Sequence, residues 1–240
     1  MQDIRKNVEE RFVSLLKEAM GDRLHAVVAY GSYATAAFRP GVSDVNLLIL
    51  TTDSVAPHVP DISRKVHRTM RRNRITPLLL TKGEFFTSAD VFPMEYMDMQ
   101  ARHEVLYGPD PTAELSFSRD NLRHELEHQL RGSLVSLRQL VLAAGGRNRE
   151  LGRYLKRWYG SIAALFRGVL RLRGVAEIPE DPEELVRRMN ESLGLEAGPF
   201  LVLIRYRAGT RTNPTSLATQ LMERLESLVA IVDAFEAERE

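Results

Sequence analysis

The chain has 240 residues, of which 44% are hydrophobic and 27% are charged, with a formal net charge of +1. This balance is ordinary for a globular protein and gives no reason to expect a polyanionic partner, so nucleic acid is not indicated. The absence of cysteine excludes disulfides, thiolate metal sites and cysteine nucleophiles. With no signal peptide and no apolar run of membrane-spanning length, we expect a cytoplasmic protein that does not contact a membrane.

The first part of the chain predicts a helix followed by two strands. Residues 2–20 place apolar side chains at helical spacing, and residues 24–30 form a short apolar run that stops at Gly31-Ser32. Residues 45–50 are apolar enough for a strand that is buried on both faces. Because strand side chains repeat every second residue, Asp44 and Asn46 are expected on the same face.

The next elements are a loop, a basic helix and a third strand. Residues 51–60 contain two prolines, and residues 61–72 predict a helix with a strongly basic end. Residues 75–81 predict a strand whose first six residues include no acid. Arginines near these elements would either contact phosphates or lie on a solvated surface; they are Arg39, Arg68, Arg71, Arg72 and Arg74.

The stretch from Val27 to Ile49 resembles the signature of the DNA polymerase beta-type nucleotidyltransferase superfamily. There a strand ends in Gly-Ser and a later strand carries two acids one position apart. The resemblance implies that Gly31 and Ser32 approach the nucleotide phosphates, together with Arg39 and Ser43 from the loop before the second strand. It also implies that positions 44 and 46 hold Mg²⁺ during transfer of a nucleoside monophosphate from a triphosphate to an acceptor hydroxyl.

The sequence departs from this pattern at two of the three acidic positions expected. The second metal position is Asn46, whose amide carries no charge and cannot act as a base, which leaves Asp44 as the best ligand. The third position falls at Pro77 or Leu78. Glu95 or Asp98 could replace that acid if residues 91–99 form a neighbouring strand, and they could equally be solvated or ion-paired.

Two functional hypotheses follow from these departures. One is an Mg²⁺-dependent nucleotidyltransferase with weak activity, and the other is a degenerate, nucleotide-binding sensor or scaffold that acts through its helical domain. Whether the chain is an enzyme stays open at this point. The acceptor is not identified by any residue pattern, and self-association is an open alternative.

The second half of the chain predicts helices only. Gly and Pro at residues 106–111 indicate a domain junction. Helices are expected over residues 118–143, 148–173 and 196–207, from Asp181-Pro182 onward, and from a cap at Thr215 or Ser216 to residue 235. Together they predict a small bundle, as in kanamycin-nucleotidyltransferase-like proteins. The expected fold is therefore α+β over residues 1–108, a linker at 109–117 and an all-α bundle over 118–240.

The first of these helices also carries a weaker pattern. Arg119 with His124, and Arg123 with His128, fit an Arg-x4-His spacing that superficially resembles the ribonuclease motif of the HEPN helical families. Arginine and histidine are abundant in this stretch, and the motif normally lies later in such domains. Solvated helix faces are the better interpretation.

Overall fold

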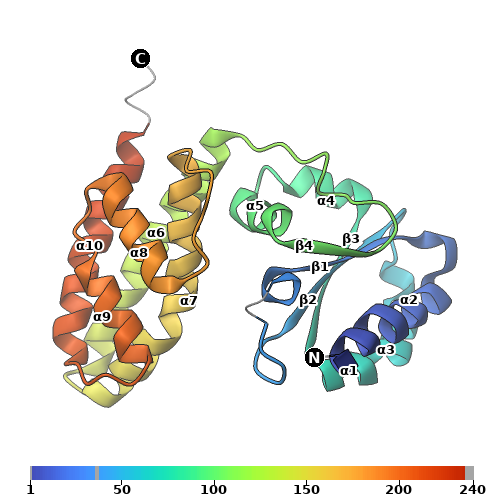
Figure 1. The fold of residues 1–240 in the computed structure, drawn as a ribbon, viewed down its shortest axis with the longest axis horizontal. Helices are drawn as coiled ribbons and strands as arrows, with labels where there is room; N and C mark the ends of the chain where they lie inside the picture. Colours follow the sequence, from blue (N-terminus) through green and yellow to red (C-terminus); the bar gives the residue numbers. More distant parts are fainter. Residues whose placement is uncertain (1, 36–37, 236–240) are drawn as a thin grey trace. The chain divides into compact units, whose positions relative to one another are not determined.

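A computed structural model describes residues 2–35 and 38–235 of the chain. By internal contacts, the chain divides into two compact units, residues 1–117 and 118–240. The first unit is built on a β-sheet and the second consists of helices (Figure 1). The fold is α+β, as the sequence predicts.

The first unit contains a mixed four-stranded sheet. Its strands are β1 (Leu24–Tyr30), β2 (Val45–Thr51), β3 (Ile75–Thr81) and β4 (His103–Tyr107). Their order is β3-β2-β1-β4. β1 runs antiparallel to β2 and to β4, whereas β2 and β3 are parallel. The two central strands, β1 and β2, are covered by helices on both faces of the sheet, which explains why their sequences are almost entirely apolar.

One face of the sheet packs against the N-terminal helices and α3. These are α1 (Gln2–Lys6), a π-helical segment (Asn7–Phe12), α2 (Val13–Met20) and α3 (Val59–Asn73), with short 3-10 turns at Gly21–Arg23 and Ala56–His58. Val45, Leu47 and Ile49 of β2 share a core with Phe12 and Leu16. Because strand side chains alternate, the even-numbered residues of β2 point to the other face.

The other face is covered by α4 (Lys82–Ser88) and α5 (Pro93–Ala101), as Figure 1 shows. Leu48 and Leu50 pack there with Phe85 of α4. Thr81 and Glu84 form a reciprocal capping box at the start of α4, which satisfies backbone donors at that end. The segment after β4 also packs against this core, through partly buried side chains at positions 115 and 117.

The second unit contains five helices within its described residues. They are α6 (Arg119–Ala144), α7 (Asn148–Leu172), α8 (Pro182–Leu193), α9 (Gly198–Arg207) and α10 (Pro214–Ala234). Helices α6, α7 and α10 run side by side in Figure 1 and contact one another. Their core includes Leu126, Leu155 and Leu221, each with no exposed surface. Burial of such side chains typically contributes about 1.5–3 kcal/mol each.

Side-chain caps begin three of these helices. Ser118 accepts from the backbone of Asn121 before α6, and Asp181 accepts from Glu184 before α8. The prediction of a cap at Thr215 or Ser216 is wrong: Asn213 caps α10 by accepting from the N–H groups of both those residues. The physical reason is Pro214, whose fixed φ suits the first helical position and leaves Asn213 as the cap. No helix in the described parts of either unit combines the length and apolarity needed to cross a membrane.

Candidate functional site

The turn that follows β1 is the first element of the candidate site. Gly31 has a φ of 72°, in the left-handed region that favours glycine, and it begins a short 3-10 turn, Gly31–Ala34. Its N–H donates to the carbonyl of Arg102 at 3.0 Å. A Cβ atom added at Gly31 would lie 3.3 Å from Nδ2 of Asn46. The turn therefore brings its backbone against Asn46 on the neighbouring strand.

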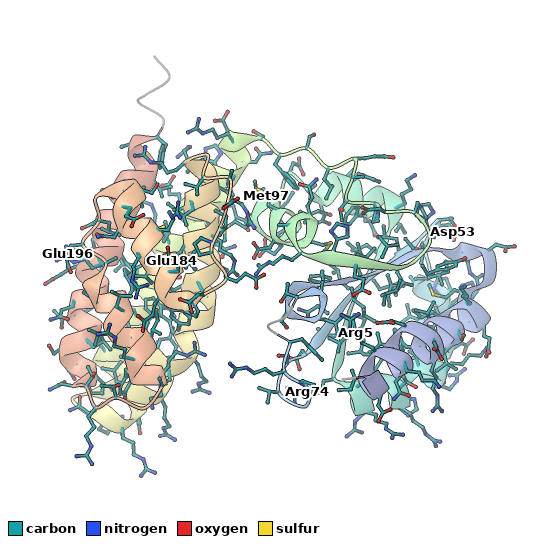
Figure 2. The ribbon with its side chains drawn as sticks, in the orientation of Figure 1. Arg5, Asp53, Arg74, Met97, Glu184 and Glu196 are labelled. Carbon is teal, nitrogen blue, oxygen red and sulfur yellow. The ribbon has the colours of Figure 1, made fainter. Side chains whose placement is uncertain are left out.

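Tyr33 anchors this turn to the N-terminal helical segment. The ring is buried, and its hydroxyl donates to Glu9 at 3.1 Å. Burial raises the pKa of Tyr33, and the negative charge of Glu9 raises it further. Arg5 packs over the same ring and pairs with Glu104 of β4 at 3.1 Å (Figure 2). These contacts hold the turn in place and leave Ser32 partly exposed beside Gly31.

The loop that leads into β2 carries the predicted residues Arg39 and Ser43. The Ser43 hydroxyl accepts from the N–H of Arg39 at 3.1 Å, and the Ser43 N–H donates to the carbonyl of Arg39 at 2.9 Å. Ser43 thus closes the loop directly before Asp44, while the residue Arg39 is exposed. Asn46 pairs with Tyr30 across the antiparallel ladder, next to the glycine turn.

Asp44 is bound by Arg74. Nε and Nη2 of the guanidinium lie 3.0 Å and 2.9 Å from Oδ1 of the carboxylate. Both side chains are about half exposed, at 53% for Asp44 and 50% for Arg74. The Val45 N–H also donates to the Arg74 carbonyl at 2.9 Å, so the backbones are held together as well. The best predicted metal ligand is therefore already paired with a cation.

The third strand offers no carboxylate beside this pair. β2 and β3 are in parallel register, and the residue opposite Asn46 is Thr76. The parallel pairing begins with Val45 opposite Ile75, directly after the Asp44–Arg74 pair. The predicted positions of the third acid, Pro77 and Leu78, follow Thr76 along β3 and carry no acid either. A threonine hydroxyl is neutral, so it does not replace a catalytic acid.

Glu95 and Asp98 do not lie on a strand. The prediction of a strand over residues 91–99 is wrong, because Pro93 begins α5 and the edge strand β4 forms later. Glu95 lies in the first turn of α5 and is exposed. Asp98 pairs with Arg102 at 3.2 Å, four residues along. Asp98 is thus linked to the glycine turn through Arg102, whose carbonyl accepts from Gly31.

The donor set does not fit a protein-bound Mg²⁺. Mg²⁺ prefers carboxylate and water oxygens in near-octahedral geometry. At this corner the side chains are one carboxylate engaged by a guanidinium, the amide of Asn46 and the hydroxyl of Thr76. Among the described residues, no three acidic, histidine or cysteine side chains cluster closely enough to hold a metal ion. Arg74 already balances the charge of the one carboxylate at this corner.

Sequence reasoning found Arg74 as one of several basic residues but did not pair it with Asp44. The pairing follows only once β2 and β3 are known to be parallel, since the N-terminal ends of parallel neighbours meet at one end of a sheet. The residues before β2 and β3, Asp44 and Arg74, therefore become neighbours. Arg102 was not predicted, because its contribution is a backbone carbonyl that carries no residue-specific signal.

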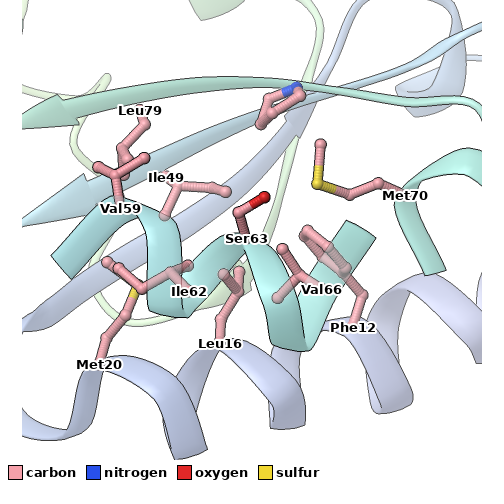
Figure 3. Close-up of a pocket in the computed structure, with 11 residues that line it drawn as sticks. Phe12, Leu16, Met20, Ile49, Val59, Ile62, Ser63, Val66, Met70 and Leu79 are labelled. Carbon is pink, nitrogen blue, oxygen red and sulfur yellow. The ribbon is translucent and has the colours of Figure 1, made fainter. Parts of the chain in front are cut away.

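A separate apolar cavity of about 190 Å³ lies between α2, α3 and the sheet (Figure 3). Its walls include Leu16, Ile49, Ile62 and Val66, and Ser63 carries the one side-chain hydroxyl among its lining residues. It has no titratable group and is on the face opposite to Asn46. We therefore do not include it in the candidate site.

Comparisons with known proteins support the fold. No protein-family model matches the sequence, and a search of curated protein sequences found no relative. Among solved structures, the chain is similar to the crystal structure of spectinomycin adenyltransferase AAD(9) from Enterococcus faecialis with ATP and spectinomycin. The TM-score is 0.55 at 14% sequence identity, over 94% of this chain and 99% of that chain. The protein shares the nucleotidyltransferase fold, including the helical part.

Proposed function

We propose that this protein binds a nucleoside triphosphate at the Gly31–Ser32 turn and that its nucleotidyl transfer is weak or absent. The observation that carries the proposal is the pairing of Asp44 with Arg74, beside an amide at position 46. The corner offers guanidinium N–H donors that suit phosphate, with the charge of Arg74 balanced by Asp44, and it lacks the pair of carboxylates that would hold a metal. In this proposal the ancestral reaction has been lost and nucleotide binding retained.

The ligand class is supported by the fold and by the turn. The similar solved structure is described with ATP, and its fold is shared along nearly the whole chain. Gly31 allows backbone to approach a ligand closely, because no side chain stands in the way. The exposed cation of Arg39 follows at the loop before Asp44. Phosphate is the group that such a combination of backbone and guanidinium donors recognises.

The weakness of transfer follows from the same residues. Transfer to a hydroxyl needs a base that takes the proton and a cation that stabilises charge on the phosphates. Asn46 has no basic group, and Thr76, the residue opposite it on β3, is neutral. Asp44 is engaged by Arg74, and Asp98 by Arg102. None of these groups is set up as a general base.

Isothermal titration of ATP, GTP, CTP and UTP tests the proposal, with Mg²⁺ and with EDTA. We expect saturable binding of at least one nucleotide in EDTA and no more than a small gain from Mg²⁺. Asn46→Asp is the companion variant for transfer, measured as pyrophosphate release across a panel of hydroxyl acceptors. We expect little release from the wild type or from the variant.

Three results would contradict parts of this proposal. Absence of binding by every nucleotide would remove the nucleotide-based function and leave the fold unaffected. Binding that requires Mg²⁺ and disappears in Asp44→Ala would favour an active transferase. Strong pyrophosphate release from Asn46→Asp alone would show that the site lacks only its second carboxylate.

A further inference from the structure

Arg74 has an unusual backbone conformation for its residue type. Its φ and ψ are 53° and 42°, and it is the one non-glycine residue with positive φ among the residues that the structure describes. It ends α3, where its N–H donates to the carbonyl of Met70. Glycine is the common choice at such a helix end, because a side chain there is strained. A strained residue of this kind points to a role for its side chain.

The side chain of Arg74 is placed at the edge of the sheet where β2 and β3 begin. Figure 2 shows it at the opposite end of β2 from Asp53, which follows that strand. Asp44 lies two residues before Asn46, a separation of about 6.5 Å along an extended chain. The Asn46 side chain in turn lies beside Gly31, because its Nδ2 would be 3.3 Å from a Cβ atom added at that glycine. A nucleotide phosphate on the glycine turn would therefore lie within reach of the long Arg74 side chain.

Arg74 also has unused hydrogen-bonding capacity. A guanidinium carries five N–H donors, and Asp44 engages its Nε and one Nη. The side chain is half exposed, so a ligand in solvent can reach the remaining donors. An arginine stays charged at every physiological pH and binds phosphate with two parallel hydrogen bonds. Asp44 meanwhile limits the rotation of the guanidinium.

We propose that Arg74 binds a phosphate group of the nucleotide held at the Gly31–Ser32 turn, with Asp44 as the residue that positions its guanidinium. The inference rests on the proposed function and adds which side chain binds the phosphates. The arginine supplies hydrogen-bond donors to the phosphate where the donor set holds no metal. Affinity then depends on phosphate number and ionic strength and is independent of divalent cations.

The test compares ATP, ADP, AMP and adenosine by isothermal titration in EDTA. The central variant is Arg74→Gly, which removes the guanidinium and also relieves the left-handed strain. Its melting temperature is expected to stay unchanged or rise, so weaker binding cannot be attributed to misfolding. We expect ATP affinity to fall by about 10-fold or more and adenosine affinity to change little. Arg71→Gln, an exposed arginine in the last turn of α3, is the matched control and should leave affinity unchanged.

Asp44→Asn separates this proposal from a metal site. The amide oxygen can still accept from the guanidinium, so we expect ATP binding in EDTA to remain within about threefold of wild type. Loss of binding in that variant, or a wild type that binds only with Mg²⁺, would overturn the inference. Equal ATP affinity in wild type and Arg74→Gly would overturn it while leaving nucleotide binding intact. A wild type that binds no nucleotide would overturn the proposed function and the inference together.

Discussion

Two glycines beside β1 have almost the same backbone conformation and different surroundings. Gly31 follows the strand with a φ of 72°, and Gly108 lies against its beginning with a φ of 79°. A Cβ at Gly108 would lie 2.1 Å from the backbone oxygen of His25. A Cβ at Gly31 would meet only the side-chain nitrogen of Asn46, at 3.3 Å. A side chain can move away from an added methyl group more easily than backbone can. A substitution is therefore expected to disturb the fold more at Gly108 than at Gly31.

Gly108 is thus required by the fold, whereas Gly31 belongs to the candidate site. At Gly108 the chain passes so close to β1 that only glycine fits. At Gly31 the packing would tolerate a small adjustment, and the glycine instead keeps open the space in front of Asn46. The end of β1 near Gly31 is thus the end at which we propose that the nucleotide binds.

Gly108→Ala is expected to have the largest effect on stability. Its methyl group must displace the backbone of β1, and alanine is also strained at this φ, so we expect a loss of about 3 kcal/mol. Urea unfolding followed by circular dichroism measures it. Gly41→Ala is the matched control, because Gly41 has a φ of 77° and an added Cβ there would meet no atom within 4 Å. It should lose only about 1 kcal/mol from backbone strain. Equal losses in the two variants would remove the distinction that the comparison draws.

Gly31→Ala should lower the stability less than Gly108→Ala does, and it should also weaken nucleotide binding. We expect a loss of about 1–2 kcal/mol from backbone strain and crowding against Asn46. Nucleotide affinity should fall because the methyl group occupies the approach to the turn. The double variant with Asn46→Ala relieves the crowding and leaves the strain. Its loss of stability should therefore be smaller than the sum of the losses in the two single variants. Strict additivity in this double-mutant cycle would show that the side chain at position 46 does not oppose a methyl at Gly31.

The sequence predicted those parts of the first unit that follow strong periodicity. The strands over residues 24–30, 45–50 and 75–81 are mainly apolar runs bounded by turn or polar residues, and each is present. Residues 91–99, considered as a strand in the prediction, lie largely in helix α5, and the edge strand β4 was not predicted. Residues 91–107 contain no clean period of two, and a five-residue edge strand with a half-exposed face carries little signal.

The sequence named Gly31, Asp44 and Asn46 as candidate site residues and did not predict how they pair. Gly31 and Asn46 lie side by side because β1 and β2 are adjacent strands, with Tyr30 opposite Asn46. The pairing of Asp44 with Arg74 depends on which strands are parallel and in what register, and local patterns do not contain that information. Asp98 was placed on the wrong element, yet its pairing with Arg102 follows from helical spacing once α5 is known.

Asp110 extends the comparison to the acids at the two ends of β1. Asp44 near Gly31 is half exposed and holds a half-exposed arginine, whereas Asp110 fixes the chain just after Gly108. Its Oδ1 accepts from the N–H and the hydroxyl of Thr112, both at 2.8 Å, and its Oδ2 lies 3.1 Å from Nε2 of His103. Partial burial works against the charged form, but these hydrogen bonds outweigh it and hold the pKa of Asp110 below its ordinary value.

Asp110→Asn is therefore expected to have the smallest effect, and one that depends on pH. A carboxylate whose pKa is lowered by folding stabilises the protein above the unfolded-state pKa of about 3.9, and this contribution is lost as pH falls through the lower folded-state pKa. At pH 7 the variant should lose about 1 kcal/mol or less, because the side chain is partly exposed and the amide keeps one acceptor. Urea unfolding of wild type and variant at pH 7, 5 and 3 should show a gap that is steady down to pH 5 and narrower at pH 3. A gap that is as wide at pH 3 as at pH 5 would mean that the hydrogen bonds of Asp110 stabilise the segment after β4 without a contribution from its charge.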